Sequence, residues 1–146
     1  MPDGLTLDKR DFAELLVPCA ASTKAFAYTL LPDRFFRSGN EQYDKIFSLL
    51  DDDSKQLVGI AAPRGIGKST ICSLAHPMKR ITFREKNFIV PISKSATNAT
   101  VFGEDLKGEM ARNELISSLF GPQKTEQFSK ELWVTAGGTC VMPRGR

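Results

Sequence analysis

A short glycine-bearing turn between an apolar run and a helical stretch constrains the fold of this chain more than any other feature. Residues 56–62 form a short apolar run, which is typical of a strand buried on both faces of a sheet. The turn occupies residues 63–67, and residues 68–78 then show helical spacing, with Pro77 expected to kink or end the helix. A second apolar run at residues 87–92 predicts another strand. The order strand, turn, helix, strand predicts an α/β fold with parallel strands and a right-handed crossover.

The turn has the residue types that bind a triphosphate. Gly65 and Gly67 permit the backbone to curl closely around phosphate oxygens, because no Cβ stands in the way. Lys68 is placed to reach the outer phosphates, and Ser69 would give a hydroxyl ligand to Mg²⁺ at a helix N-terminus of partial positive charge. We therefore expect ATP and Mg²⁺ to bind here, with Lys68 and Arg64 as catalytic residues and Ser69 as the metal ligand. The nucleotide-binding residues would be Ala62, Pro63, Arg64, Gly65, Ile66, Gly67, Lys68, Ser69 and Thr70.

Two residues of the turn leave alternatives open. The phosphate-loop consensus G-x-x-x-x-G-K-[ST] has glycine where this chain has Ala62, so the strict pattern fails at its first position. The alternative is a surface turn that happens to contain the same glycines and lysine. Arg64 lies inside the turn, where its guanidinium would either stabilise charge on the γ-phosphate or form a structural salt bridge.

Bulk properties fit one globular domain and exclude several classes of protein. The chain has 146 residues, 41% hydrophobic and 25% charged, which is neither disordered nor fibrous composition. It has neither a bilayer-length apolar run nor a secretory signal, so we expect a cytoplasmic protein with no membrane partner. Its three separated cysteines and single histidine favour buried thiols over disulfides or a zinc site. The net charge of +3 is too small to indicate nucleic-acid binding, and its basic residues are most simply a solvated surface.

Periodicity and turn residues predict the remaining elements. Apolar residues at helical spacing predict helices at 8–20, 43–50, 99–110 and 115–120. Residues 21–40 are expected to be irregular, and the acidic residues 51–53 to form a solvated connection. Two short strands flanking Gly137 and Gly138 predict a hairpin.

The segment 60–70 resembles the variant phosphate loop of terminase large subunits, the DNA-packaging motors of tailed bacteriophages. That family often has a non-glycine residue first and a basic residue within the loop, as Ala62 and Arg64 are here. The resemblance continues at residues 92–95, which look like the exit of the family's second strand. Two further segments resemble the family: residues 113–121 look like its "N-E-x-L … F-G" segment, and residues 137–146 look like its hairpin and arginine-glycine turn.

The resemblance implies a RecA-like (ASCE) P-loop NTPase core, here incomplete, with N-terminal helices and a C-terminal β-hairpin. Residues 1–40 would be a lead-in and residues 41–146 a partial ATPase domain, without the acidic strand and without the family's nuclease domain. Gln42 and Tyr43 are the candidates for an adenine contact, Tyr43 also lying on an apolar stripe where packing is its expected role. The implied partners are double-stranded viral DNA, a portal protein, the small terminase subunit and further copies in a ring.

Three functions remain open on the sequence. The chain would belong to a packaging motor that hydrolyses ATP, to a different P-loop ATPase such as a helicase-like enzyme, or to a non-catalytic fragment. Hydrolysis in this fold needs an Asp for Mg²⁺ and a Glu that activates water. No apolar strand ending in adjacent acids follows the phosphate loop. We therefore expect this chain to bind ATP and to hydrolyse it poorly by itself.

Overall fold

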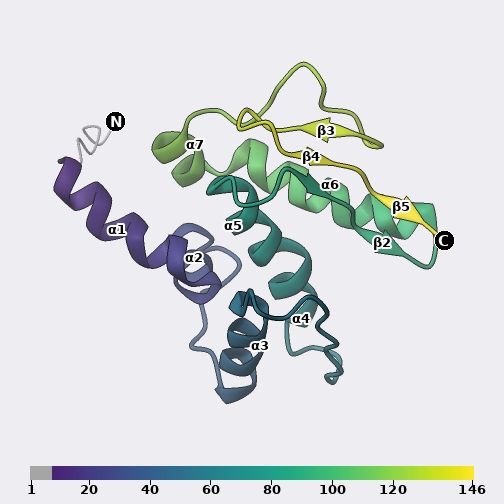
Figure 1. The fold of residues 1–146 in the computed structure, drawn as a ribbon, viewed down its shortest axis with the longest axis horizontal. Helices are drawn as coiled ribbons and strands as arrows, with labels where there is room; N and C mark the ends of the chain where they lie inside the picture. Colours follow the sequence, from purple (N-terminus) through teal and green to yellow (C-terminus); the bar gives the residue numbers. More distant parts are fainter. Residues whose placement is uncertain (1–7) are drawn as a thin grey trace.

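The computed structural model describes residues 8–146 as helices with a few short strands, which confirms a mixed α/β composition (Figure 1). The helices are α1 (Lys9–Ala21), α2 (Thr23–Leu30), α3 (Glu41–Asp51), α4 (Lys68–Thr70), the π-helix η1 (Ile71–Ala75), α5 (His76–Thr82), α6 (Ala96–Arg112) and α7 (Glu114–Phe120). The strands are β1 (Phe88–Ile89), β2 (Ile92–Ser93), β3 (Trp133–Val134), β4 (Cys140–Val141) and β5 (Arg144–Gly145). Within the described residues, no helix combines the length and apolar character needed to cross a bilayer.

The strands form two small sheets. One has the order β1-β4-β3, where β4 pairs parallel with β1 and antiparallel with β3. The other pairs β2 parallel with β5. The predicted hairpin is thus confirmed as β3 and β4, with Gly138 at φ +89°, and the predicted strand at 87–92 is divided at Val90–Pro91. The C-terminal residues therefore supply the parallel partners of the strands that follow α5.

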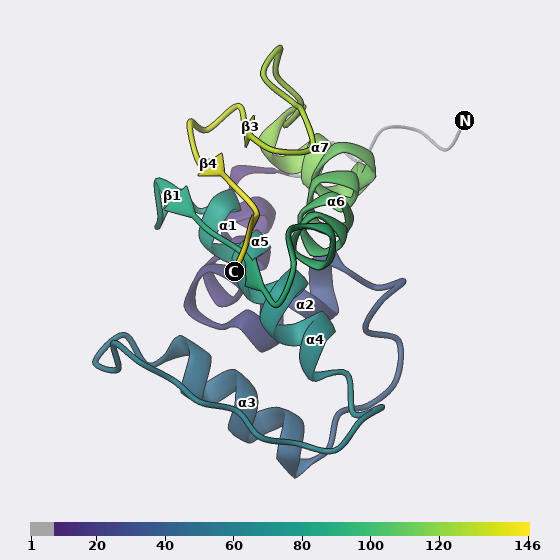
Figure 2. The same cartoon turned by 90° about the vertical axis from the view of Figure 1, so that its right-hand side faces the viewer.

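The prediction of a strand at residues 56–62 is wrong. This segment is extended but belongs to neither sheet, and the side chain of Leu57 is 93% exposed. Figure 2 shows it running back along α3, away from the strands. A strand needs a neighbour to bond its backbone, whereas a cavity of about 520 Å³ separates Val58 from Ile89 on β1. The expected parallel βαβ unit is consequently not formed between residues 56–62 and β1.

Residues 21–40 are not wholly irregular, because α2 occupies Thr23–Leu30. The Ser22 side chain accepts a hydrogen bond from the Ala25 N–H at 3.3 Å, which caps the start of the helix. Phe26 and Leu30, one turn apart, are buried in the core. The turn residues at 32–33 and 38–40 predict irregular structure, whereas the cap at Ser22 starts a helix before them.

The helix after the glycine turn is also longer than expected, since it continues through Pro77 to Thr82. Proline lacks an N–H and its ring clashes with the carbonyl four residues earlier, which in a regular helix produces a kink. Here a π-helical turn precedes it: the His76 N–H bonds to the carbonyl of Ile71, five residues back. The wider turn accommodates the ring, so the helix neither ends nor breaks at Pro77.

A single core joins the N-terminal helices to the rest of the chain. Its buried side chains include Phe26 on α2, Phe47 on α3, Met78 on α5, Leu106 on α6 and Trp133 on β3. Helix α6 packs against β2 and β5, and it ends at Asn113, whose side chain caps α7 by accepting from the Ile116 N–H at 2.9 Å. This arrangement places the glycine turn at the edge of the molecule, between α3 and the helix that follows the turn (Figures 1 and 2).

Candidate phosphate-binding site

The turn at residues 63–67 is curled, as the phosphate-loop hypothesis requires. Gly65 has φ +83° and Gly67 has φ +76° with ψ 12°, both in the left-handed region that favours glycine. The helix that follows closes its first bond from the Ile71 N–H to the Gly67 carbonyl at 3.1 Å. The amides at the start of a helix have no intrahelical acceptor, so those of residues 68–70 are available to an anion.

Lys68 reaches back over the turn. Its ammonium donates to the carbonyl of Ala62 at 3.0 Å and to that of Pro63 at 3.4 Å. The charge therefore lies over the mouth of the loop, where it would exchange these carbonyls for phosphate oxygens. Cys72 lies one turn further along the helix, and burial raises the pKa of its thiol even though the charge of Lys68 opposes the shift. This thiol stays protonated at neutral pH and is not a nucleophile.

The other loop residues differ in how they are placed. Ser69 is exposed at the first turn of the helix, where its hydroxyl is open to a metal ion held by phosphates. Arg64 is also exposed, and among residues 8–146 it takes part in none of the salt bridges, so the structure gives no support to a structural ion pair.

Within residues 8–146, no group of three or more His, Cys, Asp or Glu side chains is arranged to hold a metal. The site thus has one hydroxyl for Mg²⁺, and the triphosphate would have to provide most of the other ligands.

Gln42 lies on a different side of the loop from the helix N-terminus. It lines a pocket of about 280 Å³ with Ala62, Pro63 and Ile66. That pocket excludes Gly67 and every residue of the helix after it. The structure therefore brings Gln42 to the start of the loop but not to Gly67 or the N-terminus of the helix that follows.

Several aromatic residues adjoin Gly67 and Thr70 on the other side, and of these the sequence argument selected only Tyr43. The hydroxyl of Tyr43 is so close to Gly67 that a Cβ built there would be 2.9 Å from it. Tyr43 is half-buried and packs against the core, as expected, but it also lines a pocket of about 160 Å³ with Tyr28 and Phe36. The sequence signal for this group was the run Arg-Phe-Phe-Arg at residues 34–37, which falls in the stretch predicted to be irregular.

A buried hydrogen-bond chain anchors the helix behind the loop. The carboxylate of Asp51 accepts from the Thr23 N–H at 2.8 Å and from the Thr23 hydroxyl. Since that hydroxyl donates to Asp51, its oxygen accepts from Nδ1 of His76, 3.2 Å away. The acidic run at 51–53 is therefore not a simple solvated connection. Asp51, the last residue of α3, bonds to Thr23 of α2, which in turn bonds to His76 of α5, and Asp53 bonds to Arg80 at 2.8 Å.

The hydrogen bonds around His76 predict that the protein loses stability in mild acid. Burial lowers the pKa of His76 to about 4, below its ordinary value of 6.5, so the unfolded chain binds the proton more tightly. His76 contributes its full stability above pH 6.5 and loses it progressively as pH falls towards 4. We expect the free energy of unfolding to fall between pH 7 and pH 5 in urea titrations, and to fall less in His76→Asn, whose amide still donates to Thr23. Equal falls in both proteins would contradict this role.

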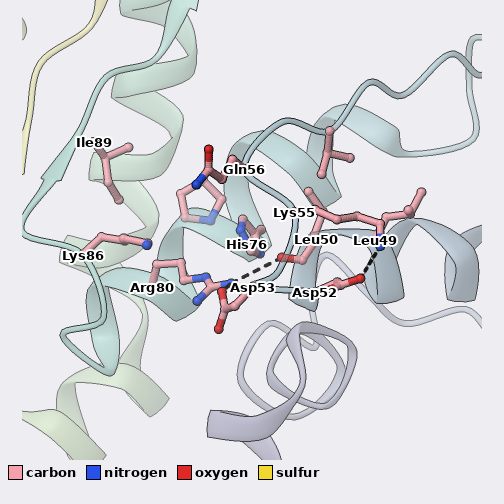
Figure 3. Close-up of a pocket in the computed structure, with 12 residues that line it drawn as sticks. Leu49, Leu50, Asp52, Asp53, Lys55, Gln56, His76, Arg80, Lys86 and Ile89 are labelled. Carbon is pink, nitrogen blue, oxygen red and sulfur yellow. Dashed lines mark hydrogen bonds and ion pairs between the residues drawn. The ribbon is translucent and has the colours of Figure 1, made fainter.

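Figure 3 shows the cavity of about 520 Å³ between residues 52–58 and β1. His76, Arg80 and Lys86 lie along it, and none of residues 62–70 does. A hydrogen bond from Arg80 holds the pKa of Asp53 below its usual range, so this carboxylate stays charged. The cavity is therefore separate from the phosphate loop, and its charged groups already pair with one another in part.

The candidate phosphate-binding group thus consists of Gly65, Gly67, Lys68 and Ser69, which both the sequence and the structure place together. No protein-family model, curated protein or solved structure matches the chain, so the geometry of the loop is what supports a function.

Proposed function

We propose that this chain binds ATP through residues 62–70 and is the nucleotide-binding part of a DNA-packaging ATPase of the terminase large-subunit type. The observation that supports the proposal is the curled loop, with two glycines at positive φ and the Lys68 ammonium across its mouth. Such a loop is suited to an anion at a helix N-terminus. The RecA-like P-loop fold stays a proposal that rests on the loop and its helix, since residues 56–62 do not form the strand that precedes the loop in that fold.

Each loop residue has a role in this proposal. Gly65 and Gly67 shape the backbone around the phosphates, and Lys68 neutralises the β- and γ-phosphates. Ser69 would hold Mg²⁺, which draws charge from the phosphate oxygens. Arg64, exposed beside them, would stabilise charge on the γ-phosphate. The loop contains no carboxylate, so it binds and orients the nucleotide without supplying a base for water.

In the whole motor, ATP hydrolysis would drive double-stranded viral DNA into a procapsid in the host cytoplasm. The partners would be the portal protein, the small terminase subunit and further copies of the motor in a ring. The second candidate, ATP binding without hydrolysis, is favoured because no apolar strand ending in adjacent acids follows the loop in this sequence. Measuring binding and turnover separately on the same protein distinguishes the two.

The test compares two glycine-to-alanine substitutions in one segment. At Gly67, alanine would have positive φ and a Cβ 2.9 Å from the hydroxyl of Tyr43, whereas a Cβ at Gly59 meets nothing within 4 Å. The left-handed conformation costs roughly 1–2 kcal/mol for a non-glycine residue, so affinity should fall about ten-fold. We expect calorimetry to show weaker Mg·ATP binding for Gly67→Ala and unchanged binding for Gly59→Ala. Equal affinities, or no binding by the parent chain, would remove the proposed function.

A further inference from the structure

The strands that follow α5 form one continuous parallel ladder with residues 140–146. Every second amide from residue 140 to residue 146 donates to a carbonyl within residues 87–93, at 2.8 to 3.1 Å. Since successive side chains of a strand point to opposite faces, every second residue of each strand lies on the same face. One face packs inward: Val141 and Trp133 are fully buried, and Pro143 lies against Gly103 of α6.

The opposite face of this ladder is apolar and uncovered. Phe88 is 54% exposed and Ile92 is 67% exposed, whereas Ile89 between them packs against the core. In Figure 2, α5 and α6 lie on the same side of β1 and β4, and no helix of residues 8–146 lies over the other side. Parallel strands are normally covered on both faces, so a layer is missing here. The uncovered side chains, which we call the outer face, are Phe88, Val90, Ile92, Val134, Cys140 and Met142.

The two ends of the outer face are basic. The guanidinium of Arg144 donates to the sulfur of Met142, so it lies over the face itself. The carboxylate of Glu85, near one end, already bonds to Lys79 and Arg80. Five exposed cations take part in none of the salt bridges among residues 8–146: Arg84 and Lys86 at one end, and Lys94, Arg144 and Arg146 at the other.

We propose that the outer face is an interaction surface for an acidic amphipathic helix of a partner protein. A helix suits it because helices cover the faces of parallel strands in α/β proteins. Residues 87–93 extend over roughly 23 Å at about 3.3 Å per residue, which a helix of about 15 residues matches. Apolar side chains along one stripe of that helix would meet Phe88 and Ile92, and carboxylates beside the stripe would meet the unpaired cations.

A second copy of this chain fits the outer face less well. Both ends of the face are basic, so two outer faces packed together would bring cations against cations in either orientation, which is unfavourable. A polyanion such as DNA would match the cations but would leave Phe88 and Ile92 in water. The proposed surface does not depend on nucleotide binding by the loop.

The test measures binding of a fluorescent peptide to the 146-residue chain by anisotropy. The peptide has about 16 residues, with leucines at i, i+3, i+4 and i+7, glutamates beside them and alanines elsewhere. It should bind about ten-fold or more tightly than the same peptide with lysines in place of glutamates. Phe88→Ser and Ile92→Ser should each weaken binding about ten-fold, because each removes a large apolar contact. Both side chains are exposed, so both variants should fold.

The control variant is Val101→Ser. Val101 is 61% exposed on α6, outside the outer face, so this change removes an equally exposed apolar side chain and should leave peptide binding unchanged.

Cys140 gives a second readout, because it lies between Phe88 and Val134 on the outer face. The peptide should slow alkylation of Cys140 by iodoacetamide and leave that of Cys72 unchanged, since Cys72 lies on η1 behind the phosphate loop. Peptide mapping by mass spectrometry measures both thiols in the same sample.

Equal binding of the two peptides, unchanged binding by Phe88→Ser and Ile92→Ser, or an unprotected Cys140 would overturn the proposal. Binding of anionic phospholipid vesicles or duplex DNA in place of the peptide, lost in Ile92→Ser, would assign the face to a membrane or a nucleic acid and would also overturn it. A dimer in sedimentation velocity that Ile92→Ser dissociates would do the same, because a second copy would then cover the face.

Discussion

Lys68→Ala is expected to abolish measurable binding of Mg·ATP and of Mg·tripolyphosphate to this chain. The ammonium lies over the loop, 3.0 Å from the Ala62 carbonyl and 3.4 Å from that of Pro63. Two or more charge-assisted bonds to phosphate would replace these, each worth roughly 1.5–3 kcal/mol. Their loss predicts at least a hundred-fold weaker binding in calorimetry.

The control for this prediction is Lys130→Ala, which removes the same charge from an exposed loop before β3. Binding by this variant should be near that of the parent, so a long-range effect of net charge is separated from contact with phosphate. The fold should survive in both variants, because Lys68 bonds only to carbonyls of its own loop. Equal affinity in Lys68→Ala and the parent would remove the phosphate-loop mechanism altogether.

The second large effect is on stability, and it concerns two glycines of α6 that the structure places differently. A Cβ at Gly103 would lie 2.4 Å from Cγ of Pro143, a buried ring just before β5 that cannot swing away. A Cβ at Gly108 would meet only the guanidinium end of Arg112, a flexible side chain. Overpacking of a core costs about 1–3 kcal/mol, whereas replacing glycine by alanine in a helix gains up to about 1 kcal/mol.

We therefore expect Gly103→Ala to lower the free energy of unfolding by about 1–3 kcal/mol and Gly108→Ala to leave it unchanged or to raise it. Urea denaturation followed by circular dichroism measures both. The two variants carry the same substitution in the same helix, so helix propensity cancels in their difference. Similar stabilities would show that Pro143 does not pack against α6 in the way the structure has it.

The phosphate loop is the part of the site that local sequence specifies. Gly65 and Gly67 adopt positive φ because they alone in the turn have no Cβ, and Lys68 reaches back because its chain spans the turn. The helix that follows is likewise local, since each of its hydrogen bonds joins residues a few positions apart. The break between α6 and α7 is local as well, because the Asn113 side chain caps the second helix.

The sequence by itself determined the turn, most of the helices and the C-terminal hairpin, whose bonds are local. Only the tertiary structure decided what residues 56–62 do, because a strand depends on a neighbour far away in the chain and here a cavity separates Val58 from β1. It also decided which residues surround the loop: packing of α3 directs Gln42 to one side of it and Tyr43 to the other. Apolar character shows that a segment can pair or be buried, and the three-dimensional arrangement of its partners determines whether it does so.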